Sequence, residues 1–469
     1  MRVPTRTLSI VGILLLMLAA VVGPILYSGY ADLHSAQAAL ADKNYDDASR
    51  LFEMAATHLV WRNDLWEQAG LAAYRNGNNA EAIRLLEIAR DKKSLSSQGW
   101  DTLGIAYWNS SNHQTALTIW QEGSQAYPFD VVLYDRLALV YYENGEYASE
   151  QNVLVKRLLI ASDANAHYQL GLLLTLSDSN RALTELADAS SMDPQFDSAV
   201  QTLQVAIAVS DTESDPANRF IAIGRGLGLV EEWGLAQNAF EKAVSADAKN
   251  AEAWAWLGEA SQHNGQDGSD DLNRALALDS NDAIVHALRG LYWKRRGNNA
   301  QALTEYLQAA QIEPDNPAWR ASVGDAYTQT GDLVSALAAY QKATQLAPND
   351  VTYWSLLAMF CSDNDLYVLD IGLPAAKQAA QLAPNDPQTL DVLGWLYSNA
   401  GLLYNAEQNL QHAIKLSPDL AIAHLHLAEN YLRQGDRTSA FNELNLTIQL
   451  DKDGTSGQTA AQILKQYFP

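Results

Sequence analysis

Histidine is the residue type in this sequence that could serve either as a metal ligand or as a general base. The chain has nine histidines among 469 residues, scattered along its length. The closest pair, His424 and His426, is spaced i, i+2, which puts the two rings on different faces of a helix and not on one metal ion. No nucleophile stands beside a base at a spacing that indicates a catalytic pair. We therefore expect no catalytic residue, no metal site and no cofactor.

Two short motifs resemble parts of known sites. The glycines of GRGLG at 224–228 resemble a dinucleotide fingerprint, but that fingerprint follows a strand, whereas this segment lies within a predicted helix. The sequence DKDGT at 451–455 resembles the nucleophile motif of haloacid-dehalogenase phosphatases. Only 14 residues follow Thr455, too few to build that fold. We interpret the first motif as helix packing and the second as a turn.

Charge and cysteine content narrow the classes of partner. The chain has 31 Lys and Arg against 55 Asp and Glu, a net charge of −24, which argues against nucleic-acid binding. Its single cysteine, Cys361, excludes an intrachain disulfide and a cysteine-based metal knuckle. The densest basic cluster, at 289–296, ends a predicted helix, where the macrodipole favours cations. The alternative for this cluster is a site for an acidic partner tail.

The elements that position these residues are visible in the stretch 97–130. Large and small apolar residues are spaced there as on two facing helices, with a proline after the second: Trp100, Leu103, Gly104, Tyr107, Ala116, Trp120 and Pro128. Gly104 and Ala116 leave room where the two helices approach most closely. Pro128 cannot continue the second helix and separates this unit from the next.

This W-x2-L-G-x2-Y pattern resembles the tetratricopeptide repeat (TPR) family, and a frame of about 34 residues places it twelve times between residues 29 and 452. The resemblance implies an all-α solenoid of antiparallel helix pairs wound into a superhelix. It also implies that the first helices line a concave groove that binds peptides or partner proteins. We expect about 12 helix-turn-helix repeats, one N-terminal transmembrane helix and a C-terminal capping helix.

The repeat frame divides the chain into segments. Repeats 1–5 occupy residues 29–194 and repeats 6–12 occupy 217–452, with a capping helix at 453–469. Between the two blocks, residues 195–216 form one unpaired helix and an acidic, turn-rich linker. We interpret this segment as a hinge or a change of curvature, and the alternative is a degenerate repeat packed like the others.

The N-terminus carries an apolar run. Residues 8–27 form 20 uncharged positions, enough for a helix of about 30 Å, after Arg2 and Arg6. The positive-inside rule then puts residues 1–7 in the cytoplasm and the repeats outside the cell membrane. We expect an uncleaved single-pass anchor of a bacterial envelope protein. The alternative is a signal peptide cut before Asp32.

The resemblance also identifies candidate binding residues, because inward-facing positions of the first helices are known in the family. Eight of them are our candidates for the protein-binding groove: Tyr74, Trp108, Tyr142, Arg225, Trp256, Glu259, Asp391 and Trp395. The three tryptophans are the expected anchors, since aromatic residues dominate binding hot spots. Alternatively, each packs against the adjacent repeat. The lysine with which some TPR cochaperones grip a C-terminal carboxylate is missing from all twelve repeats.

These observations predict a membrane-anchored scaffold that binds proteins or peptides and supports an envelope complex. It would bind no nucleic acid and no small-molecule substrate. One alternative is a chaperone-like holder of secreted clients, as in cytochrome c maturation. Another, from a different class, is an envelope enzyme with an unrecognised site.

Overall fold

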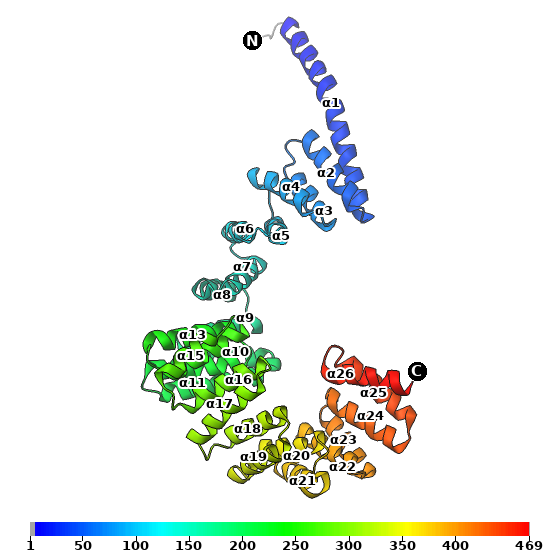
Figure 1. Ribbon diagram of the computed structural model, residues 1–469. Helices are drawn as coiled ribbons and strands as arrows, with labels where there is room; N and C mark the ends of the chain where they lie inside the picture. Colours follow the sequence, from blue (N-terminus) through cyan, green and yellow to red (C-terminus); the bar gives the residue numbers. More distant parts are fainter. Residues whose placement is uncertain (1–4, 469) are drawn as a thin grey trace. The chain divides into compact units, whose positions relative to one another are not determined.

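A computed structural model describes the backbone of residues 5–468 and the side chains of residues 20–468 (Figure 1). The described residues form 26 α-helices, a 3₁₀ turn at Pro194–Phe196 and a π turn at Val368–Gly372, with no strand among them. Contacts divide the chain into two compact units. Unit 1 comprises the residues up to Thr212 together with Ala222–Ala236, and unit 2 comprises Glu213–Ile221 together with the residues from Gln237 onward.

The helices of unit 1 are α1 (Thr5–Ala41), α2 (Tyr45–His58), α3 (Asp64–Arg75), α4 (Asn79–Asp91), α5 (Ser97–Asn109), α6 (His113–Ala126), α7 (Val131–Glu143), α8 (Tyr147–Ile160), α9 (Ala164–Leu174), α10 (Ser179–Met192) and α11 (Asp197–Thr212). The next two, α12 (Pro216–Leu229) and α13 (Trp233–Ala246), contribute residues to both units.

The remaining helices belong to unit 2. They are α14 (Ala251–His263), α15 (Ser269–Leu278), α16 (Ala283–Arg295), α17 (Asn299–Ile312), α18 (Pro317–Thr330), α19 (Leu333–Leu346), α20 (Val351–Asp363), α21 (Leu373–Leu382), α22 (Pro387–Asn399), α23 (Leu403–Leu416), α24 (Ala421–Gln434), α25 (Arg437–Leu450) and α26 (Thr455–Tyr467).

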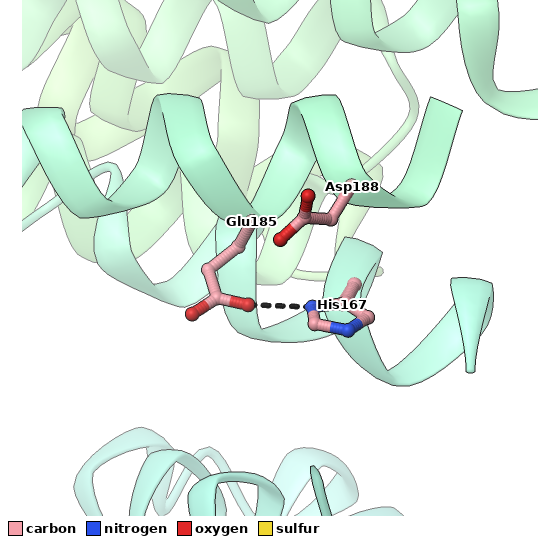
Figure 2. A group of neighbouring side chains, drawn as sticks. All are labelled: His167, Glu185 and Asp188. Carbon is pink, nitrogen blue, oxygen red and sulfur yellow. Dashed lines mark hydrogen bonds and ion pairs between the residues drawn. The ribbon is translucent and has the colours of Figure 1, made fainter. Parts of the chain in front are cut away.

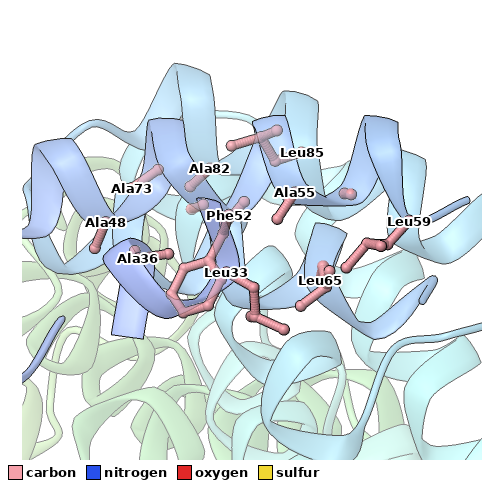
Figure 3. Close-up of a cluster of buried hydrophobic side chains, with 14 residues drawn as sticks. Leu33, Ala36, Ala48, Phe52, Ala55, Leu59, Leu65, Ala73, Ala82 and Leu85 are labelled. Atoms are coloured by element: carbon pink, nitrogen blue, oxygen red, sulfur yellow. The ribbon is translucent and has the colours of Figure 1, made fainter. Parts of the chain in front are cut away.

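Consecutive helices pack on one another through small residues. At the start of unit 1, the buried cluster in Figure 3 joins α1 to α4 around the fully buried Phe52. A Cβ on Gly70 would come within 2.6 Å of Leu86 Cγ, and one on Gly104 would overlap the indole of Trp120. The predicted close approach at Gly104 is therefore confirmed. The same steric reason favours glycine or alanine at this position throughout the solenoid.

The turns follow from local chemistry. Asp130 caps α7 by accepting hydrogen bonds from the backbone N–H groups of Val132 and Leu133. Gly331 follows α18 with φ +85°, a left-handed conformation that glycine adopts without a Cβ clash. Asp130 thus begins α7, and Gly331 ends α18.

The helix count exceeds that of twelve repeats. Twelve helix pairs would supply 24 helices, whereas the described residues contain 26. The two beyond the pairs in our frame are α11 and α26. Helix α26 packs against α24 and α25, with Ala460 fully buried beside Leu425 and Leu444. The segment boundaries drawn from the sequence stay predictions.

The membrane anchor expected at residues 8–27 is wrong. Among the described residues, no helix combines the length and the apolar character that crossing a bilayer requires. The apolar run belongs to α1, which continues to Ala41 and packs Leu33 and Ala36 into the repeat core. Asp32, on the same helix, accepts a hydrogen bond from His58 at 3.0 Å.

The predicted location, with a cytoplasmic N-terminus and an extracytoplasmic body, depended on that anchor and is therefore wrong as well. Residues 1–4 of the predicted cytoplasmic segment lie outside the described residues.

Candidate functional site

A recess beside the predicted binding residue Trp108 lies between α5 and α7 of unit 1. It has a volume of about 190 Å³ and is lined by Ile105, Trp108, Asn109, Trp120, Arg136, Leu139 and Val140. Three of these residues lie at i, i+3 and i+4 on α5, and three more have the same spacing on α7. This spacing puts each trio on one helix face, so two neighbouring first helices build the walls. We call this recess the α5–α7 pocket.

The indole of Trp108 is held by other aromatic rings. It stacks on His113 with centroids 4.0 Å apart and an interplanar angle of 16°, and it lies 6.1 Å from the Trp120 ring. Across the pocket, Leu139 is 50% exposed. Arg136 donates from Nε to Asp101 Oδ1 at 2.9 Å. The pocket thus has a rigid aromatic wall at Trp108 and an apolar wall at Leu139 that is open to solvent. Its cation, Arg136, is paired with Asp101.

Tyr142 lies one turn beyond Leu139 on α7, beside two carboxylates. Its hydroxyl donates to Glu232 Oε2 at 2.7 Å, and burial together with this bond raises the tyrosine pKa. Glu150 on α8 is only 1% exposed, and its Oε2 has no hydrogen-bond partner. Burial and the charge of Glu232 raise the pKa of Glu150 to about 8.

The predicted residues Trp256 and Glu259 lie one turn apart on α14 of unit 2. Both oxygens of the buried Glu259 carboxylate accept from Arg295, at 2.7 and 2.5 Å. Trp256 stacks on Phe240 with centroids 5.9 Å apart and donates from Nε1 to Glu252. These interactions join neighbouring helices within unit 2.

Asp391 and Trp395 share a partner on the next first helix. Asp391 is buried and accepts from His426 Nδ1 at 2.8 Å, while Trp395 stacks on the same imidazole at 4.3 Å with an angle of 9°. The guanidinium of Arg433 lies 5.0 Å from the Trp395 ring centre. The face of α22 and α24 is therefore a connected set of rings and charges.

Of the other two predicted residues, Tyr74 is half-buried and packs against the N-terminal core of unit 1, and Arg225 is exposed on α12. None of these placements tests whether the eight residues bind a partner, so their role stays a prediction. Sequence reasoning missed Leu139 and Ile105 as pocket residues. Their i, i+3 spacing to Tyr142 and Trp108 was the available signal.

The basic cluster at 289–296 is paired within the protein. Each of its four cations contacts a carboxylate of a neighbouring helix or turn: Arg289 with Glu305, Lys294 with Asp325, Arg295 with Glu259 and Arg296 with Asp267. The cluster consequently joins repeats to one another.

Within the described part of the chain, one cluster has the residue types of a metal site. Figure 2 shows His167 of α9 with Glu185 and Asp188 of α10; one ligand atom from each lies within 4.8 Å of the others. His167 Nδ1 is 2.6 Å from Glu185 Oε2, and Nε2 is 2.9 Å from Ser162 Oγ. A histidine nitrogen and two carboxylates can hold a divalent cation.

Two other repeats contain the same histidine–glutamate pair. His286 Nδ1 is 2.7 Å from Glu305 Oε2, and His424 Nδ1 is 2.6 Å from Glu443 Oε2. In all three repeats the histidine is the fourth residue of the first helix and the glutamate the seventh of the second. Because this pair recurs at one position, we interpret it as a structural hydrogen bond between the two helices of a repeat.

Comparisons with known proteins agree on the repeat type. A tetratricopeptide repeat model matches residues 67–131, and a model described as the C-terminal domain of cilia and flagella-associated protein 70 matches residues 269–463. The predicted tetratricopeptide repeats are thus confirmed over these ranges.

Individual relatives are distant. Superkiller complex protein 3 of Homo sapiens is 24% identical over 232 residues, which are 46% of this chain and only 13% of that protein. Yeast Tom70 is 15% identical with a TM-score of 0.42, covering 93% of this chain and 95% of its own. MamA from Desulfovibrio magneticus RS-1 is 24% identical with a TM-score of 0.32, covering 36% and 94%.

Proposed function

We propose that this tetratricopeptide-repeat chain is a scaffold that binds proteins or peptides through the faces of its first helices. The observation that carries the proposal is the α5–α7 pocket, where the held indole of Trp108 faces the half-exposed Leu139. Rigid aromatic surface lining a recess that loses its water on binding is typical of binding hot spots. Tyr142, one turn farther along α7, extends the same surface.

The proposal contains no reaction. The matched repeat family is a protein-interaction fold, and the buried carboxylates Glu259 and Asp391 are held by Arg295 and His426 within the protein. An acid that is tied to a structural partner is poorly placed to transfer protons to a substrate.

A second candidate function is a holder of extended client segments. The same pocket supports it, because one apolar recess can accept side chains from many sequences. The two functions differ in their complexes: a scaffold holds particular partners in fixed ratio, whereas a holder binds many partners transiently.

The deciding experiment is purification of the tagged full-length chain from its native cells, followed by mass spectrometry of the retained proteins after a high-salt wash. A few partners in stoichiometric amounts are expected for a scaffold. Many substoichiometric proteins would favour the holder. An empty column, together with thermal stabilisation by small metabolites, would overturn both.

A further inference from the structure

We propose that the groove along α7 recognises a segment of a partner that combines a bulky apolar side chain with a basic one. The apolar side chain enters the α5–α7 pocket, and the lysine or arginine pairs with Glu232. This inference rests on the proposed function and names the chemistry of the partner.

The pocket has the size and lining for one apolar side chain. Its volume is about 190 Å³, and most of its lining is hydrocarbon or aromatic carbon from Ile105, Trp108 and Leu139, among others. An apolar protein cavity of roughly 150 Å³ holds a benzene ring, so an aromatic or branched aliphatic side chain fits here. Burying such a side chain contributes about 1.5–3 kcal/mol.

The charged residue of the pocket, Arg136, does not select an acidic partner. Arg136 is committed to Asp101 at 2.9 Å, so a carboxylate entering the pocket would have to displace an existing ion pair. The chain as a whole has a net charge of −24, which repels acidic segments and attracts basic ones.

A cation is favoured one turn farther along the helix. Glu232 accepts from Tyr142, and burial together with the charge of Glu232 raises the pKa of the nearly inaccessible Glu150, whose Oε2 has no partner. A buried acid with a raised pKa is mostly protonated at pH 7, so the negative charge of the pair lies on Glu232, which accepts its hydrogen bond from the neutral hydroxyl of Tyr142. A lysine or arginine side chain of the partner would compensate the charge of the partly buried Glu232.

The spacing of the two subsites predicts a sequence pattern. Leu139 and Tyr142 are i, i+3 neighbours, with Cβ atoms about 5–6 Å apart. An extended segment rises about 3.3 Å per residue and alternates its side chains. Because Glu232 lies beyond the Tyr142 hydroxyl, the apolar and basic residues of the partner should lie at least two residues apart, on one side of the segment.

The test uses the full-length chain and a phage library of randomised short peptides, followed by titration of the enriched peptides. Enriched peptides should pair a bulky apolar residue with lysine or arginine at that spacing. Leu139→Asp, which places a charge in the pocket, should weaken their binding about tenfold or more. Glu232→Gln should weaken it less and reduce its salt dependence.

Leu159→Asp is the matched control, because Leu159 is 84% exposed on α8 and outside the pocket. It should leave affinity unchanged, and circular dichroism should report the same helix content for all three variants. Acidic enriched peptides, or peptides that bind Leu139→Asp as tightly as the wild type, would overturn this inference and leave the proposed function standing. Absence of any enriched peptide, with no stoichiometric partner from cells, would count against the proposed function itself.

Discussion

At the scale of single residues, histidine replaces tryptophan at one position of the repeat. Trp100 and Trp254 are the fourth residues of their first helices, and His286 holds the same position in α16. A tryptophan there fills space between helices, whereas His286 donates to the buried Glu305 and, through Nε2, to the Ser280 carbonyl. The repeat thereby substitutes a charged hydrogen bond for apolar contact.

This pair predicts a pH-dependent contribution to stability. The hydrogen bond to Glu305 raises the pKa of His286, so the contribution of the imidazolium is full below about pH 6.5 and is lost as pH rises through the raised value. Burial raises the pKa of Glu305, but the hydrogen bond to His286 outweighs it together with the nearby charges, so the pKa is lowered. The stability that the ionised Glu305 contributes is therefore lost as pH falls. We expect His286→Gln to destabilise the protein by about 1 kcal/mol more at pH 6 than at pH 8.5.

Denaturant unfolding of wild type and His286→Gln at the two pH values measures this difference. His412→Gln, an exposed histidine on α23, is the control and should show no pH-dependent gap. Equal destabilisation by His286→Gln at both pH values would mean that the pair acts by packing alone.

How far the sequence predicts a residue's role depends on its neighbours. The family pattern predicted that Glu259 and Asp391 face the groove, but it could not show that Arg295 and His426, 36 and 35 residues away, would take their charges. That pairing depends on how adjacent repeats stack. The sequence did not predict the α5–α7 pocket for the same reason, because its walls come from two adjacent repeats.

At the scale of elements, the 34-residue frame predicted helix pairs and their close contacts from small residues. Gly104→Ala should destabilise the protein by about 1–3 kcal/mol, because the added Cβ meets the Trp120 indole. The control is Gly23→Ala, where a Cβ meets nothing within 4 Å, and alanine should stabilise that helix by about 0.5–1 kcal/mol. Thermal unfolding of both variants measures the contrast, and equal effects would contradict the packing account.

The final helix gives a second prediction at this scale. Ala460 is fully buried on α26 and its neighbour Ala461 is exposed. Ala460→Asp buries a charge and should weaken the packing of α26 by about 3 kcal/mol, whereas Ala461→Asp should have little effect. Hydrogen exchange should show lost protection in α24 to α26 alone, since repeats contact mainly their neighbours. Unchanged protection in Ala460→Asp would mean that α26 does not cover α25.

The N-terminal helix shows where a sequence pattern misleads. Twenty uncharged residues predicted a bilayer span, but a count of apolar residues does not reveal that the helix continues past the run and packs on protein there. Helix α1 runs on to Ala41 and packs Leu33 and Ala36 against α2. Whether a helix continues into a repeat core depends on its contacts with other helices, and the hydropathy of a short stretch of sequence does not report those contacts.

At the scale of the whole molecule, the chain divides close to the acidic segment that interrupts the repeats. Helix α11 ends at Thr212 and α12 begins at Pro216, and one of the three boundaries between the units falls between Thr212 and Glu213. We predict that glutamyl endopeptidase first cuts after Glu213, since its neighbours Thr212 and Ser214 are exposed and connections between helices are preferred sites of cleavage. Glu213→Gln should abolish the early fragments. Early cleavage elsewhere in both proteins would contradict the prediction of a hinge.

The central claim is that the α5–α7 pocket binds a partner protein, and the affinity of the partner recovered from cells tests it most directly. Titration should show that Trp108→Ala weakens binding by about 2 kcal/mol or more, as hot-spot residues do. Trp61→Ala, a control at a tryptophan 54% exposed in the turn before α3, should leave affinity unchanged. Equal affinity of wild type and Trp108→Ala, with helix content intact, would contradict the account.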